Sequence, residues 1–301
     1  MMQGRTDLAL ELQKDFIANQ DINGIKVIIR KDKELEIKET TIIVENEEGA
    51  NAIGKPVGAY ITLESAHLGI EDSDYHKEMS EALSDVLKYM IGSSNSILVI
   101  GLGNINVTAD SLGPRTVERI YITRHLVEKN YYDNIIEISA LSPGVMAQTG
   151  METSEVIEGM VKQVKPDFVV AIDALAARGP EHLGRTIQVS NTGIVPGSGV
   201  GNHRNAINQE TVGVPVIAIG VPMVVSVASM VDYVIDSIVA HENDENNNQM
   251  HFSDETCEKI ANKLEEDTIQ DMYVTPKTID DMVNKISDTI ANAMNSLLQS
   301  P

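Results

Sequence analysis

Aromatic residues and cysteine are scarce in this sequence. Trp is absent, Phe occurs three times, and aromatic residues make up 4% of the 301 residues. Because 42% of the chain is hydrophobic, it can still bury a sizeable core, which must be mainly aliphatic. The one cysteine, Cys257, excludes an internal disulfide and fits a reducing, cytoplasmic compartment.

Basic residues are also few. The chain has 23 Lys and Arg against 45 Asp and Glu, which gives a formal charge of −22. Since nucleic acids and anionic membranes bind to basic surfaces, this balance argues against either as a direct partner. It leaves open a substrate protein that itself binds DNA. The N-terminus shows no apolar core of a signal peptide.

One uncharged stretch, 212–231, is long enough to suggest a membrane span. Two prolines and a glycine interrupt it. Because these residues divide a chain into shorter elements, the better interpretation is a buried strand over 214–219, a turn, and a buried helix that begins at Met223.

Signature motifs of several enzyme classes are missing. Gly101 and Gly103 follow an apolar run, but Asn106 stands where a dinucleotide-binding fingerprint needs its third glycine. No phosphate-binding loop, GxSxG elbow or HExxH motif occurs. Cys257 has acidic and polar neighbours, which make it a poor nucleophile. The sequence therefore predicts no cofactor, although a metal site made from distant residues stays open.

Apolar runs alternate with helical patterns through the middle of the chain. The predicted strands are 96–101, 134–140, 167–172, 186–190 and 214–219, and the predicted helices are 114–129, 153–165 and 223–240. This order favours an α/β fold with a mainly parallel central sheet flanked by helices. Alternation within 24–45 predicts extra antiparallel strands at the N-terminus, and 74–90 has helical spacing. An amphipathic helix, with an apolar stripe from Ile279 to Leu297, is predicted at the C-terminus.

Two aspartates follow predicted strands. Asp110 lies in the loop after one apolar run, within GLGNINVTADSLGPR, and five apolar residues run directly into Asp173. The carboxyl ends of parallel strands share one edge of an open α/β sheet, where ligands bind. Two carboxyls there can supply an acid and a base that activate water, or can bind a metal that does so. A turn or cap role for Asp110, and pairing of Asp173 with Arg178, are the structural alternatives.

Long motifs characteristic of one known family occur in order along the chain. They are RTDLALE at 5–11, YITLES at 60–65, GLGNINVTADSLGPR at 101–115, ITRHL at 122–126, SPGVMAQTGMET at 142–153, PDFVVAIDALAAR at 166–178, SGVGNHR at 198–204, GVPVIAIGVP at 213–222 and VTPK at 274–277. In these segments the chain resembles the germination protease family of spore-forming bacteria. The resemblance implies an α/β fold related to that of the hydrogenase-maturation proteases, a homotetramer, and two catalytic aspartates that match Asp110 and Asp173.

The resemblance also implies an endopeptidase made as a self-processing zymogen. The cut is expected between Asp7 and Leu8, which divides the chain into a short propeptide, 1–7, and a single α/β protease domain, 8–301. The implied substrates are small acid-soluble spore proteins, and the implied location is the cytoplasm of the spore core. The enzyme itself would contact neither nucleic acid nor membrane.

Substrate binding and metal dependence are further hypotheses. A peptide in a cleft needs backbone hydrogen bonds from a strand edge or a loop. Gly197, Gly199 and Gly201 could allow close backbone approach to a substrate, and Arg178 is a further candidate. Because the related maturation proteases hold a metal with acids at comparable places, the alternative is a metal-dependent peptidase with His203 as a possible extra ligand. A non-catalytic binding protein on the same fold is the third possibility.

Overall fold

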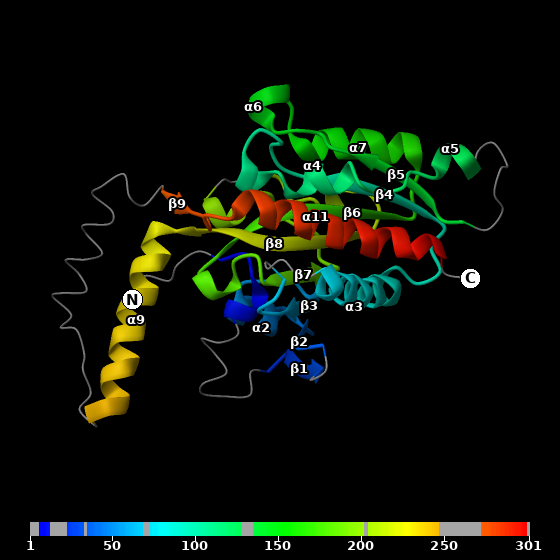
Figure 1. The fold of residues 1–301 in the computed structure, drawn as a ribbon. Coiled ribbons are helices and arrows are strands. Elements are labelled where there is room, and N and C mark those ends of the chain that lie inside the picture. The colour runs from blue at the N-terminus through cyan, green and yellow to red at the C-terminus, as the bar shows by residue number, and fades with distance from the viewer. Residues whose placement is uncertain are drawn as a thin grey trace.

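The computed structural model describes residues 6–12, 23–32, 35–68, 73–127, 135–201, 204–246 and 272–299. These residues form a nine-stranded sheet with helices packed on both faces (Figure 1). The strand order is β1-β2-β3-β7-β8-β6-β4-β5, and β9 pairs with β8. The strands are β1 (Ile25–Asp32), β2 (Ile37–Val44), β3 (Gly58–Glu64), β4 (Ser96–Gly101), β5 (Glu137–Leu141), β6 (Phe168–Ala177), β7 (Thr186–Ser190), β8 (Val216–Ser226) and β9 (Tyr273–Val274).

Helices connect and cover these strands. The α-helices are α2 (Glu47–Ile53), α3 (Ser73–Ile91), α4 (Leu112–Val117), α5 (Arg124–Val127), α6 (Met146–Thr149), α7 (Thr153–Val164), α8 (Gln209–Val212), α9 (Val227–Asn246) and α11 (Ile279–Ser296). Short 3-10 turns are η1 (Thr108–Asp110), η2 (Pro180–His182), η3 (Ser198–Val200) and η5 (Leu297–Gln299). The predicted α/β class is confirmed.

The sheet has a parallel half and an antiparallel half. Strands β8, β6, β4 and β5 pair in parallel. Strand β7 is antiparallel to β8 and to β3, and β1 and β2 continue the antiparallel half outward. The added N-terminal strands are therefore present, and the parallel arrangement is confined to the strands that alternate with helices.

Two apolar clusters hold the helices on the sheet. On one face, α3 and α11 lie side by side (Figure 1) and pack against the side chains of Ile97 and Val99. On the other face, α7 packs against Leu98 and Ile100. This alternation along β4 follows the two-residue period of a strand buried on both faces. The predicted stripe of α11 is buried along its length, because it faces the sheet.

Several predicted boundaries are wrong. The strand predicted over 167–172 continues to Ala177, so Asp173 lies within the strand and not after its end. The element after Gly220 is not a helix from Met223, because β8 continues to Ser226 and α9 begins at Val227. Pro222 is tolerated within β8 because the register with β6 shifts by one residue there. The predicted helix 114–129 consists of two short helices, α4 and α5, joined by a loop.

Candidate functional site

Asp110 and Asp173 lie together at one edge of the parallel half. Asp173 stands within β6, and Asp110 ends η1, in the loop after β4. Because β4 and β6 are parallel neighbours, with Gly101 at the end of β4 opposite Ile172, Asp173 lies level with the end of β4, from which the loop of Asp110 begins. They line one cavity of 390 Å³. The predicted convergence of the two carboxyl groups is therefore present in the structure.

A glycine allows the loop of Asp110 to lie close to β6. Gly113, in α4, touches the backbone on both strands, since a Cβ atom there would lie 2.4 Å from the Leu102 oxygen and 2.5 Å from the Ile172 oxygen. A larger residue would push the loop outward. The loop is closed further by the amide of Asn104, which donates to Asp110 Oδ2 at 2.8 Å.

The two carboxyl groups differ in their environment. Asp173 is 4% exposed, and its burial raises its pKa well above the ordinary value, with the charges of Asp110 and Asp7 raising it further. The amide of Ala174 donates to Asp173 Oδ1 at 2.9 Å and opposes this shift. Burial also raises the pKa of Asp110, against the hydrogen bond from Asn104. Burial and like charge are the two conditions that keep a carboxyl group protonated.

A third acid, Asp7, lies in the same cavity. Its carboxylate accepts hydrogen bonds from Ser198 Oγ at 2.6 Å and from the Ala176 amide at 3.0 Å. Its own amide donates to the Ala176 oxygen at 3.0 Å. Sequence reasoning treated Asp7 only as one side of a bond to be cut. Its side chain in fact shares the cavity with Asp110 and Asp173.

The residues that follow Asp7 are buried in the body of the protein. Leu8 and Ala9 have no exposed surface. Leu8 packs against Leu175 and Val225, whereas Ala9 packs beside β2 and β3. The segment 6–12 is therefore packed into the body of the protein beside the cavity of the acids.

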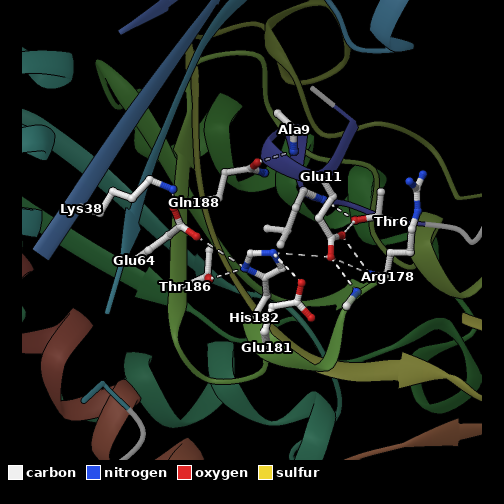
Figure 2. A network of polar contacts seen from close by, with 12 residues as sticks. Thr6, Ala9, Glu11, Lys38, Glu64, Arg178, Glu181, His182, Thr186 and Gln188 are labelled. Atoms are coloured by element: carbon white, nitrogen blue, oxygen red, sulfur yellow. Dashed lines mark hydrogen bonds and ion pairs between the residues drawn. The ribbon is translucent and has the colours of Figure 1, made fainter. Parts of the chain in front are cut away.

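Glu11 anchors this segment, as Figure 2 shows. Its carboxylate accepts from the amides of Arg178 at 2.8 Å and Gly179 at 2.7 Å, and Thr6 donates to it as well. Beside it, His182 is buried, with Nε2 3.9 Å from Glu11 Oε1 and Nδ1 3.6 Å from Glu64 Oε1. Nothing in the sequence pattern marked His182, because its neighbours come from three separate segments.

The predicted substrate-binding residues fall at different places. Gly197 lines the cavity of the three acids. Gly199 lies against Asp7, since a Cβ atom there would be 2.2 Å from Asp7 Oδ2. Gly201 closes η3 with φ of 75°. Arg178 donates its backbone amide to the Glu11 carboxylate.

The possible metal ligand His203 lies outside the described residues. Within the part of the chain that the structure describes, no three His, Cys, Asp or Glu side chains are arranged to hold a metal ion. The described helices also include none that is long and apolar enough to cross a membrane. Two carboxyl groups in one cavity, with different surroundings, are an arrangement suited to acid–base chemistry.

Comparisons with known proteins agree with a peptide-hydrolysing site. The family model for germination protease matches residues 5–267. The germination protease of Clostridium perfringens is 41% identical over 315 residues, covering 99% of this chain and 96% of that protein. That of Priestia megaterium is 47% identical over 249 residues, covering 79% and 67%. The chain is therefore a peptidase. It belongs to the germination protease family, whose members are endopeptidases that act in spore germination.

A solved structure was also found to be similar. It is a [NiFe] hydrogenase maturation protease, HycI, from Thermococcus kodakarensis KOD1, with a TM-score of 0.35 and 16% identity. The match covers 69% of this chain and 98% of that one. The α/β assignment of this chain is drawn from its own sheet and helices.

Proposed function

We propose that the chain hydrolyses small acid-soluble spore proteins with Asp110 and Asp173 as its catalytic acid–base pair. The observation that supports this most is the pair itself, with Asp173 within β6 and Asp110 in the loop after the parallel neighbour β4, in one cavity that Asp7 also lines. Asp173, the more buried acid, has the more strongly raised pKa and gives a proton to the leaving nitrogen. Asp110, whose pKa is raised less and whose carboxylate accepts the Asn104 amide, ionises first and takes a proton from water.

We further infer that the chain is made as a zymogen that cuts itself between Asp7 and Leu8. This would leave 8–301 as a single α/β protease domain. Support comes from the segment 6–11, which lies along the site, with Asp7 hydrogen-bonded to Ala176 of β6. A segment held in this way excludes other peptides from the groove, so its release is a condition for activity on other proteins.

We also propose that the chain assembles as a homotetramer and acts in the cytoplasm of the spore core. Helix α9 stands away from the sheet (Figure 1). Apolar side chains on it are exposed: Tyr233 by 40%, Val234 by 49% and Ile238 by 44%. An exposed apolar face of this kind is suited to contacts between subunits.

A metal-dependent peptidase with the same acids is the second candidate function. Three carboxyl groups line one cavity, and hard divalent cations prefer oxygen ligands, but the described acids are not arranged to hold an ion, so a metal would have to draw them together. Asp7, Asp110 and Asp173 would be the residues nearest to such an ion.

One experiment separates the two functions. The purified protein, either stripped of metal with a chelator or supplied with divalent cations, is incubated with a small acid-soluble spore protein, and the cut sites are read by mass spectrometry. The acid–base mechanism predicts cleavage in both samples. Cleavage only in the sample with metal would mean that Asp110 and Asp173 act as metal ligands. No cleavage in either sample would contradict the proposed function.

A further inference from the structure

Two hydrogen-bond donors converge on the carbonyl oxygen of Asp7. Lys55 Nζ donates to it at 2.9 Å, and Gln188 Nε2 donates at 3.3 Å. This carbonyl belongs to the bond between Asp7 and Leu8. Two donors on one carbonyl oxygen are the arrangement with which many hydrolases stabilise the negative charge that develops on that atom in the transition state.

Both donors are held in place by the fold. Gln188 lies in the middle of β7 and is 8% exposed. Its Oε1 accepts the amide of Ala9 at 2.8 Å, and this fixes the orientation of the amide group so that Nε2 faces Asp7. Lys55 follows Gly54, which ends α2, and precedes β3. Residues preorganised in this way need little rearrangement when charge develops.

Asp7 lies between these donors and the acid pair. Lys55 and Gln188 line a second cavity, of 140 Å³. Asp7 and Leu175 line both this cavity and the one that contains Asp110 and Asp173. Asp7 therefore borders both the cavity of the two donors and the cavity of the two carboxyl groups.

The charge of Lys55 depends on its surroundings. Burial lowers its pKa below 10.5, and the negative charge of Asp7 opposes this shift. The other titratable group that lines this cavity is Tyr60, whose phenol is kept neutral because burial raises its pKa. Lys55 is thus the cation beside the Asp7 carbonyl, and it loses its proton at a lower pH than an exposed lysine.

We propose that Lys55 and Gln188 are catalytic residues that stabilise the oxyanion formed on Asp7 when the Asp7–Leu8 bond is hydrolysed. The proposal rests on the proposed self-processing of this bond. The water oxygen bonds to the Asp7 carbonyl carbon while Asp110 takes the water proton, and the C=O electron pair moves to the oxygen that both donors hold. The C–N bond then breaks, and the Leu8 nitrogen takes the Asp173 proton, which leaves a carboxyl group on Asp7 and a free amine on Leu8.

Self-processing of the full chain tests this directly. The first-order rate at which residues 1–7 are lost is followed by mass spectrometry between pH 6 and pH 10 for the wild type, Lys55→Met, Lys55→Arg and Gln188→Met. Lys162→Met is the control, since Lys162 lies on α7 and pairs with Glu158 at the surface. Thermal unfolding of every variant shows whether it is folded.

We expect Lys55→Met and Gln188→Met each to process about 10²–10³-fold more slowly, which is the usual effect of removing one oxyanion donor. The wild-type rate should fall at alkaline pH as Asp173 and Lys55 each lose a proton, and the part of the fall that belongs to Lys55 should disappear in Lys55→Arg. A residue that only anchors the segment would change the rate without removing this part of the alkaline fall.

Each other result has a definite meaning. If both neutral variants process within about threefold of the wild type while Asp173→Asn does not process, the oxyanion role is wrong and the acid pair stands. If the alkaline profile of Lys55→Arg is the same as that of the wild type, the charge of Lys55 is not used. If the wild type cuts a spore protein but never cuts at Asp7, the carbonyl is not a reacting atom and this inference is wrong. If it cuts nothing, the proposed function itself fails.

Discussion

The buried polar groups in the two halves of the sheet differ in what surrounds them. In the parallel half, the buried carboxyl of Asp173 has a backbone donor and two acidic neighbours. In the antiparallel half, the hydroxyls of Thr40 and Thr62 lie opposite each other on β2 and β3, buried, and neither has a hydrogen-bond partner in the described part of the chain. Burial of the Asp173 carboxyl costs folding free energy and places that group in the candidate site. Burial of the two threonine hydroxyls also costs folding free energy, without an evident role.

Topology explains why the acids gather in one half. Parallel strands all end at one edge, so the loops after β4 and the end of β6 meet there. Antiparallel strands send their loops to both edges. In the antiparallel half, the hydrogen bonds to the segment 6–12 come from Gln188, in the middle of a strand, and from Lys55, in the connection before β3.

The largest expected effect comes from Asp173. Asp173→Asn should lower the rate of peptide hydrolysis about 10²–10⁴-fold, because the amide cannot supply the acidic proton. The same variant should be more stable than the wild type near neutral pH. The folded-state pKa of Asp173 is raised, so the native state binds more protons than the unfolded state, and wild-type stability falls as pH rises from the unfolded pKa toward the folded pKa.

Urea unfolding at pH 5 and pH 7.5, together with a peptide-cleavage assay, measures both effects. Asp167→Asn is a matched control, because Asp167 lies just before the other end of β6 and accepts the amides of Asn95 and Ser96 at 2.8 and 3.0 Å. It should lose some stability and keep activity. Equal activity losses in the two variants would show that the loss at Asp173 does not depend on its pairing with Asp110.

A pair of glycines tests how the parallel half holds Asp110. Gly113→Ala places a methyl group against two backbone oxygens, so we expect a loss of about 1–3 kcal/mol in the free energy of unfolding and a displaced Asp110. Gly159→Ala, on the exposed side of α7 with no atom near the new methyl group, should gain about 0.5–1 kcal/mol. Denaturant unfolding of both variants gives the comparison, and a Gly113→Ala protein as stable and active as the wild type would contradict it.

The smallest effect is expected in the antiparallel half. Thr40→Val removes a buried hydroxyl that has no partner and keeps the side-chain shape, so stability should rise by about 1 kcal/mol or less. Thr41→Val, the next residue along β2, removes a hydroxyl that donates to Glu39 and should not stabilise. If thermal unfolding shows equal shifts for both variants, the buried hydroxyl has no special cost.

Individual residues show how far the sequence predicts the site. Asp110 and Asp173 were found from sequence because each follows a run of buried residues, and burial of a strand is a local pattern. Asp7 was expected only at a cleavage point, and Lys55 and Gln188 were not expected at all. Their roles come from contacts between segments up to 181 residues apart, as between Asp7 and Gln188, and no spacing rule covers such distances.

By itself, the sequence determined the elements whose pattern is local. These include β4 and β7, which have the predicted bounds, and the buried stripe of α11. Only the tertiary structure decided that β7 runs antiparallel, that β8 passes through Pro222, and that Asp7 lies between the two cavities. The physical reason is that the hydrophobic period depends on neighbours along the chain, whereas strand direction and side-chain partners depend on which distant segments bury one another.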